Sequence, residues 1–403
     1  MKRIKSVFCI LSIVILCISC ASGVRNLHNE EYSDLSYLKE YFGSGFEDKD
    51  AVYTLKDFKD QLSVVVPEYN GEGTNVIECA VNAAGYSELV STYTSSKIKE
   101  RNLWYYAKPL KNVRTDYFYT FLDTGLGNIE MAKDDKITAD EANNILVNVA
   151  NAKGYGRRYI GFSTDPDILN TVRTFYNGFA LFSDKTLSSI GKTLLEKEYI
   201  TGYNLKNYNY EPRFLSDYTI VYSHDDIDHL IQLIALMKSE GIICRIQIEP
   251  KVSVYQYLLD WGPIPEPSDH YRVVKDGDMY LVNAIEFDAS FEFSKKQDKE
   301  YFNSLINKNA KKSSDNPEMN GLIKGSWWQP LYTSRTVMNT GDFVAIVNNT
   351  LSNDKYSLNT FTVRNSPVDF SEFTQSDDTL TAQRTPLVVN RAFYNYLTGT
   401  SYE

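Results

Sequence analysis

Several common signatures of catalysis and cofactor binding are missing from this chain of 403 residues. Beyond residue 20 there is no Cys-x-x-Cys pair, and the chain contains no His-Glu-x-x-His, Gly-x-Ser-x-Gly or nucleotide-binding glycine motif. We therefore predict no cofactor, and we find no motif that supports an enzymatic activity.

A basic excess is also missing. The chain has 42 Lys and Arg against 52 Asp and Glu, so its formal net charge is −10. Because nucleic-acid affinity comes largely from Lys and Arg on phosphates, we predict no nucleic-acid partner. Aromatic residues are plentiful, at 13% with 30 Tyr, and hydrophobic residues reach 43%. A chain of this length and composition can bury a substantial core, and its length suggests two or three domains.

An apolar run, residues 7–18, follows three basic residues in the first five positions. Twelve residues are too few to span a bilayer, which takes about 20, but they fit the core of a signal peptide. The run ends at Ser19-Cys20. Over residues 1–22 this pattern resembles the signal of a bacterial lipoprotein, in which a small residue precedes the cysteine that is acylated.

The resemblance implies that residues 1–19 are a signal peptide, that Cys20 is lipidated and that residues 20–35 form a tether. The implied partner is a membrane, reached through the lipid anchor, and the implied location is the bacterial cell envelope. Ala21, rather than Asp, after the cysteine favours the outer membrane where two membranes are present. The alternatives are an ordinary secretory signal or an uncleaved anchor. Since the body is acidic, we expect it to stand off an anionic lipid surface.

Two cysteines remain after the signal, Cys79 and Cys244. In an oxidising compartment they could form one disulfide that joins the two halves of the chain. The alternative is a pair of buried free thiols, because free cysteine is among the most buried residue types.

Residues 36–202 read as a mainly helical domain. The clearest helix is 139–152, which opens with the capping-box pair Thr138 and Glu141 and places apolar residues at helical spacing. Polar turn-forming residues in the segment 203–210 then break the pattern, and we interpret this segment as a domain boundary. The other helices expected in this half are 55–62, 75–84, 87–98, 167–175 and 186–197.

Residues 216–403 read as an α+β domain. A strand at 218–222, a helix with apolar residues at i, i+3, i+4 and i+7, and an alternating strand at 242–249 predict a βαβ unit with parallel strands. Two hairpins are expected, 271–274 with 279–287 and 343–347 with 357–363. The predicted fold class is therefore α+β, with a mainly helical N-terminal half and then a mixed-sheet domain.

One cluster, residues 223–229, could carry chemistry. His224 and Asp225 are a plausible ligand set for a transition metal, and they follow a predicted parallel strand, where α/β folds place ligands. The competing interpretation is helix capping, because carboxylates in the first turn, with Ser223 and Asp226 as a capping pair, complement the helix dipole. His229 is expected on the face of the helix opposite to the apolar one.

A second candidate is the pair Trp327 and Trp328, which stands between polar stretches. Adjacent side chains on extended backbone point in opposite directions, so one ring can face the core and the other solvent. Tryptophan suits sugar rings or peptide side chains, and we regard the pair as a candidate ligand-binding site.

The function expected from the sequence is that of a lipid-anchored envelope protein that binds an extracytoplasmic ligand or partner without catalysis. One alternative is an envelope hydrolase that acts on a cell-wall or polymer substrate. A second alternative is a structural envelope protein whose aromatic residues only pack.

Overall fold

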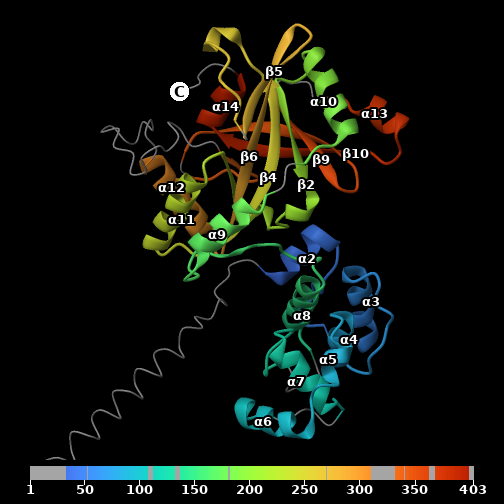
Figure 1. Cartoon of the computed structure of the whole chain (residues 1–403). Coiled ribbons are helices and arrows are strands. Elements are labelled where there is room, and N and C mark those ends of the chain that lie inside the picture. The colour runs from blue at the N-terminus through green and yellow to red at the C-terminus, as the bar shows by residue number, and fades with distance from the viewer. Residues whose placement is uncertain are drawn as a thin grey trace, which may run out of the picture.

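The structure is a computed structural model, and the residues that it describes are 33–51, 53–107, 112–131, 137–179, 182–268, 270–309, 332–339, 341–362 and 368–398. Figure 1 shows a helical part at one end of the molecule and a barrel with surrounding helices at the other. Within the described ranges no helix is both long enough and apolar enough to cross a membrane.

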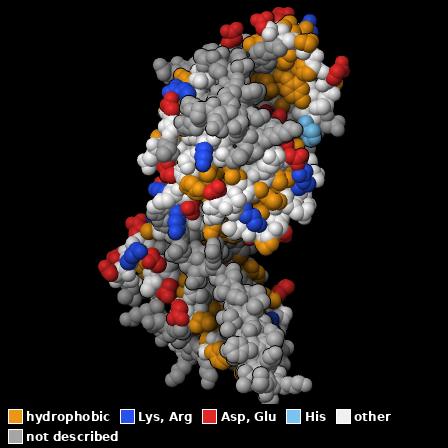
Figure 2. All heavy atoms as spheres, turned by 90° about the vertical axis from the view of Figure 1, so that its left-hand side faces the viewer, with side chains coloured by type: hydrophobic (Ala, Val, Ile, Leu, Met, Phe, Trp, Pro, Cys, Tyr) orange, Lys and Arg blue, Asp and Glu red, His pale blue; other side chains and the backbone are white. Residues whose placement is uncertain are grey.

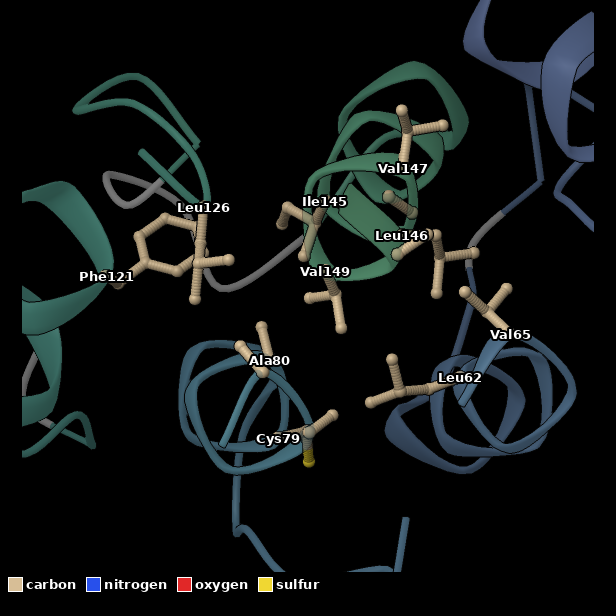
Figure 3. Packing of buried hydrophobic residues seen from close by; sticks show 14 of the residues in the cluster. Leu62, Val65, Cys79, Ala80, Phe121, Leu126, Ile145, Leu146, Val147 and Val149 are labelled. Carbon is tan, nitrogen blue, oxygen red and sulfur yellow. The ribbon is translucent and has the colours of Figure 1, made fainter. Parts of the chain in front are cut away.

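The helical part has one hydrophobic core, in which α8 packs against α2, α3 and α4. In Figure 3 Leu146 and Val149 of α8 point toward Leu62 of α3 and Ala80 of α4. The helices of this part are α2 (Asp34–Phe42), α3 (Leu55–Val65), α4 (Val76–Ala83), α5 (Ser87–Val90), α6 (Ser95–Tyr105), α7 (Thr115–Asp123) and α8 (Ala139–Ala152).

Local sequence determines where these helices begin. α8 starts with the predicted capping box, in which Thr138 accepts from the backbone N–H of Glu141 and the Glu141 carboxylate accepts from that of Thr138. Thr54 and Asp57 form the same motif at α3. The prediction of a helix over 139–152 is confirmed.

Among the described residues, eight strands close into an antiparallel barrel in the order β4-β2-β9-β8-β10-β7-β3-β6, with β6 paired back to β4. Two further strands lie outside the closed ring, β1 on β4 and β5 on β6. The strands are β1 (Gly161–Phe162), β2 (Gly202–Asn207), β3 (Thr219–His224), β4 (Cys244–Gln256), β5 (Tyr271–Asp276), β6 (Met279–Phe293), β7 (Tyr332–Ser334), β8 (Phe343–Ser352), β9 (Tyr356–Thr362) and β10 (Thr381–Asn390).

The predicted fold class, with a mixed sheet built on a βαβ unit, is therefore wrong. β3 and β4 do flank a helix, α11 (Ile227–Ser239), but they are not neighbours. β6 lies between them and pairs antiparallel with both, so that Asp288 is opposite Ser223 on one side and Glu249 on the other. Periodicity identifies a strand but not its partner, and here the partner comes later in the chain.

Two other expectations change with the barrel. The segment 203–210, interpreted as a domain boundary, mostly forms β2, a strand of the barrel wall. Helices α9 (Ile168–Asn177) and α10 (Lys185–Glu196), assigned to the helical half 36–202, pack on the barrel instead. The segments of the two expected hairpins do pair antiparallel, β5 with β6 and β8 with β9. They are not separate hairpins of a mixed sheet, however, because β6, β8 and β9 are strands of the closed barrel wall.

Helices cover the outer face of the barrel. α9, α11 and α12 (Lys296–Asn309) bury outward-facing apolar residues such as Ile220, Ile246 and Phe291. α10 and α13 (Ser371–Ser376) pack in the same way near Leu205 and Leu358. Because side chains alternate along a strand, the intervening residues of these strands point into the barrel.

The two ends of the barrel are covered differently. At one end Phe393 of α14 (Arg391–Thr398) packs on the inward-facing Ile346 and Val389. At the other end lies the helical part, with α2 beside the barrel in Figure 1.

A buried ion pair joins the helical part to the barrel. Arg157 Nε donates to Glu292 of β6 at 2.9 Å, and the Arg157 guanidinium lies 3.8 Å from the ring centre of Tyr37 on α2. Glu292 also accepts from Arg245 at 2.9 Å and from the backbone N–H of Leu215 at 2.8 Å. Glu292 thus links strand, connecting segment and helical part around one carboxylate.

Candidate functional site

The polar interior of the barrel is the candidate site, and the strand register positions it. Asp288 on β6 is directly opposite Glu249 on β4, and Glu286 is opposite Lys251, which in turn is opposite Lys206 on β2. These residues share the inward face, since each is one residue away from an outward apolar neighbour such as Phe287.

Asp288 is the centre of the charged network. Its carboxylate accepts from Lys206 Nζ at 2.5 Å, Lys251 Nζ at 2.7 Å and Ser223 Oγ at 2.6 Å. Burial by itself would raise the pKa of Asp288, but the two ammonium groups outweigh it and hold that pKa well below its usual range. Asp288 is therefore an ionised, fully engaged acceptor.

Glu249 has the opposite environment. Its carboxylate is buried, and the nearest cation, Lys206 Nζ, lies 3.6 Å from Oε2 and 2.5 Å from Asp288. Burial raises the pKa of Glu249 to about 7, because Lys206 offsets only part of the desolvation and the Asp288 charge adds to it. The two opposed carboxylates thus differ in protonation near neutral pH.

A layer of amides and hydroxyls lies beside the charges. Asn359 Oδ1 accepts from Asn348 Nδ2 and Thr350 Oγ1, both at 3.1 Å, and Asn359 Nδ2 donates to Ser357 Oγ at 3.0 Å. These four residues lie on the inward faces of β8 and β9, in register with β2.

Three inward-facing oxygens in this interior are buried without a hydrogen-bond partner among the described residues. They are Asn204 Oδ1, Asn348 Oδ1 and Ser290 Oγ. Buried polar atoms of folded proteins nearly always have partners, so these three oxygens are acceptors that the described side chains leave unsatisfied.

The interior is not sealed. The inward-facing side chains of Lys206 and Glu286 keep 19% and 25% of their surface exposed. In the described part of the chain, β10 pairs with β8 along its length but with β7 only at Val388 and Val389. Among the described strands, the first half of β10 therefore has no partner on the β7 side, and the inward-facing Gln383 there is exposed.

Tyrosines lie above the charged layer, where β5 extends the wall. Tyr271 is opposite Ala284, and Tyr255 is opposite Val282, on the same face as Glu286. Both rings are partly buried. Figure 2 shows hydrophobic side chains gathered toward this end of the molecule. The interior thus changes from tyrosine through amide and hydroxyl to charge.

The side chains of His224 and His229 lie against each other in the structure. Their ring centres are 4.1 Å apart and stacked, because His224 ends β3 while His229 lies on the buried face of α11. The expectation that His229 faces away from the apolar side is wrong. His224 Nδ1 accepts from the backbone N–H groups of Asp225 and Asp226, so that nitrogen is not available to a metal. Burial lowers the pKa of both histidines, that of His229 to about 3.

The geometry does not support a metal site at His224 and Asp225. In the described ranges no three His, Cys, Asp or Glu side chains are grouped to hold a metal ion. Asp226 caps α11 instead, accepting from the N–H groups of Asp228 at 2.8 Å and His229 at 3.3 Å. Ser223, expected to share the capping, points into the barrel and donates to Asp288.

The remaining sequence candidates do not join the site. Cys79 and Cys244 are both buried free thiols, and they belong to separate cores, one in the helical part and one beside the barrel, so no disulfide joins them. Cys20, Trp327 and Trp328 lie outside the described residues.

The polar interior of the barrel was not predicted from the sequence. The alternation in β4 is visible, but its charged residues, such as Glu249, read as a solvent-facing side. The available signal is that β6 carries a matching series, Glu286, Asp288, Ser290 and Glu292. Opposite charges in two strands at spacing two predict a shared buried face only once the two strands are known to pair.

We predict that Asp226→Ala destabilises the protein by about 0.5–2 kcal/mol, because it removes the cap of α11. Asp225→Ala is the matched control: its exposed side chain caps nothing, and its carboxylate lies 3.2 Å from His224 Nδ1, on a ring whose lowered pKa keeps it uncharged at pH 7, so the expected change is under about 0.5 kcal/mol. Urea unfolding at pH 7 measures both. Equal losses from the two variants would contradict the assignment of the cap.

We predict that Glu249→Gln changes the pH dependence of stability. The folded pKa of Glu249, about 7, lies above the ordinary glutamate value of 4.5, so its neutral form stabilises the fold below pH 4.5 and this contribution is lost as pH rises from 4.5 through 7. The glutamine variant should therefore gain stability relative to wild type across that window, by at most about 3 kcal/mol. Unfolding curves between pH 4.5 and 8 test this, with surface Glu372→Gln as control. A constant difference between wild type and Glu249→Gln would refute it.

Comparison with protein-family models, with curated proteins and with solved structures found no match to this chain. The features that bear on function are therefore the chemistry of the barrel interior and the N-terminal signal pattern.

Proposed function

We propose that this chain is a lipid-anchored protein of the bacterial cell envelope that binds a small hydroxyl-rich ligand, such as a sugar, inside its barrel without catalysis. The observation that carries the proposal is the set of three buried, inward-facing oxygens without partners, on Asn204, Asn348 and Ser290. Eight-stranded barrels have room for one small ligand when side chains do not fill them.

The chemistry of the interior favours hydroxyl groups over strong charges. Two of the unpartnered atoms, on Asn204 and Asn348, are amide oxygens, which need donors, and a hydroxyl supplies one. Lys206 and Lys251 are already paired with Asp288, so a charged ligand would have to break existing ion pairs. Tyr255 and Tyr271 offer rings with an apolar face and a polar edge, which suit the faces of a sugar.

The cellular part of the proposal rests on residues 1–22, whose basic start, apolar run and Ser19-Cys20 resemble a lipoprotein signal. Two acyl chains on one cysteine anchor a protein stably where one chain does not. In that location the barrel would meet ligands outside the cytoplasm, and the first half of β10, unpaired on the β7 side among the described strands, is the route of entry that we propose.

A second candidate function is hydrolysis of an envelope polymer, and one observation favours it. Glu249 and Asp288 are opposed carboxylates whose pKa values are displaced in opposite directions, the relation expected of a general acid and its ionised partner. Binding remains our first proposal because Asp288 is fully occupied by Lys206, Lys251 and Ser223.

Titration of the chain from Ala21 onward with glucose, N-acetylglucosamine and glucuronate tests the binding site. We expect a saturable rise in melting temperature with at least one of them, and affinity about tenfold weaker in Asn204→Leu and in the milder Ser290→Ala, because each loses an acceptor. The control is Arg384→Ala, an exposed outward-facing change on β10. No rise in melting temperature with any of these sugars, or binding that is unchanged in both variants, would contradict the proposed site and favour a purely structural role. Sugar release from a polymer, lost in Glu249→Gln, would favour the hydrolase.

For the anchor, Cys20→Ala in the full chain should remove the protein from the acylated membrane fraction or leave the precursor uncleaved. Metabolic labelling with a fatty-acid analogue reads this out, and Cys79→Ala is the matched control because Cys79 is buried in the helical core. Wild-type protein that takes up no label would overturn the lipoprotein assignment.

A further inference from the structure

The most exposed aromatic residues of the described chain cluster on α6, at the end of the molecule farthest from the barrel in Figure 1. Leu103 is 72% exposed, Trp104 68% and Tyr106 92%, and no residue of α6 is buried. Soluble surfaces rarely place large apolar side chains together without a partner. We call this surface the α6 tip and define it by Lys97, Lys99, Leu103, Trp104 and Tyr106. Its exposed apolar side chains indicate that it contacts a partner.

The backbone holds this tip in a costly conformation. Tyr106 caps α6 in the left-handed region, with φ 50°, and its N–H donates to Asn102 O at 3.1 Å. Glycine or asparagine takes this position at lower cost. A bulky ring that is turned into solvent here gives the fold no packing in return.

The tip is also locally basic. Residues 94–114 hold six Lys and Arg and one acidic residue, Glu100, within a chain of net charge −10. Arg101 and Arg114 pair with Asp123 and Asp116, which lie on α7. Apart from these two arginines, residues 94–114 contain four lysines and a single acidic residue, Glu100, so the segment carries a net positive charge.

We propose that the α6 tip inserts its side chains into the interfacial region of an anionic lipid bilayer. Trp and Tyr prefer the level of the headgroups, where a ring is partly apolar and its edge is polar. Lysines beside them gain from the negative potential of anionic lipid. This combination of rings, a leucine and lysines is the composition of interfacial membrane anchors, and it favours a lipid surface over a protein groove.

The contact goes beyond the proposed ligand site and does not depend on acylation. It differs from the expectation that the acidic body stands off the membrane, because the net charge averages over a locally basic end. The geometry is nevertheless compatible with an anchor: 12 residues lie between Cys20 and Ser33, and fully extended they could span up to about 45 Å. For comparison, α8, a 14-residue helix of the helical part, is only about 21 Å long, so the segment between Cys20 and Ser33 could span a distance greater than this helix.

Vesicle sedimentation of the unacylated chain from Ala21 onward tests the proposal. Vesicles of phosphatidylcholine with about 30% phosphatidylglycerol present an anionic surface, and pure phosphatidylcholine is the comparison. We expect binding to the anionic vesicles that weakens at least tenfold in Trp104→Ser and falls in about 0.5 M salt. Lys99→Glu should weaken binding to the anionic vesicles but not to the neutral ones.

The matched control is Tyr199→Ser, which removes a ring that is 58% exposed elsewhere on the surface and should leave vesicle binding unchanged. Since Trp104 is exposed, its variant should keep the wild-type melting temperature. Wild-type protein that stays in the supernatant, or Trp104→Ser that sediments like wild type, would overturn the proposal. So would a wild-type dimer that Trp104→Ser dissociates, because the tip would then be a contact between copies. Sugar binding in the barrel is unaffected by either result.

Discussion

The inner wall of the barrel depends on one buried carboxylate, that of Asp288. It accepts from Ser223 on β3, Lys251 on β4 and Lys206 on β2, so three strands converge on β6 through a single side chain. A buried charge is tolerated only when its partners are complete. A slip of β6 by one residue would move Asp288 out among the apolar side chains under the helices, so this carboxylate also selects the register.

The distribution of polarity follows from the helices that surround the barrel. They bury its outer face, as at Ile220 and Phe291, so apolar packing lies outside the wall and the interior is free to be polar. The same inward face of β6 continues to Glu292, which holds Arg157 and thereby the helical part. One strand therefore carries both the candidate site and the junction between the two parts of the molecule.

Charge acts locally in this protein. The net charge of −10 describes neither the interior, where Lys206 and Lys251 neutralise Asp288, nor the α6 tip, where lysines outnumber Glu100. In the interior, local charge and burial move the pKa of Glu249 up and that of Asp288 down, because Lys206 lies closer to Asp288 than to Glu249.

Local elements could be predicted from the sequence, because caps and periodicity act over a few residues: the helix from Ala139 to Ala152 with its Thr138 cap is as predicted. Strand pairing could not be predicted in this way, since hydrogen bonds between strands join segments far apart in the chain. β6 came between β3 and β4, and this turned an expected parallel unit into a closed barrel. For the same reason the sequence did not show that Glu249 and Asp288 face each other. Their strand faces are buried only because the barrel closes around them.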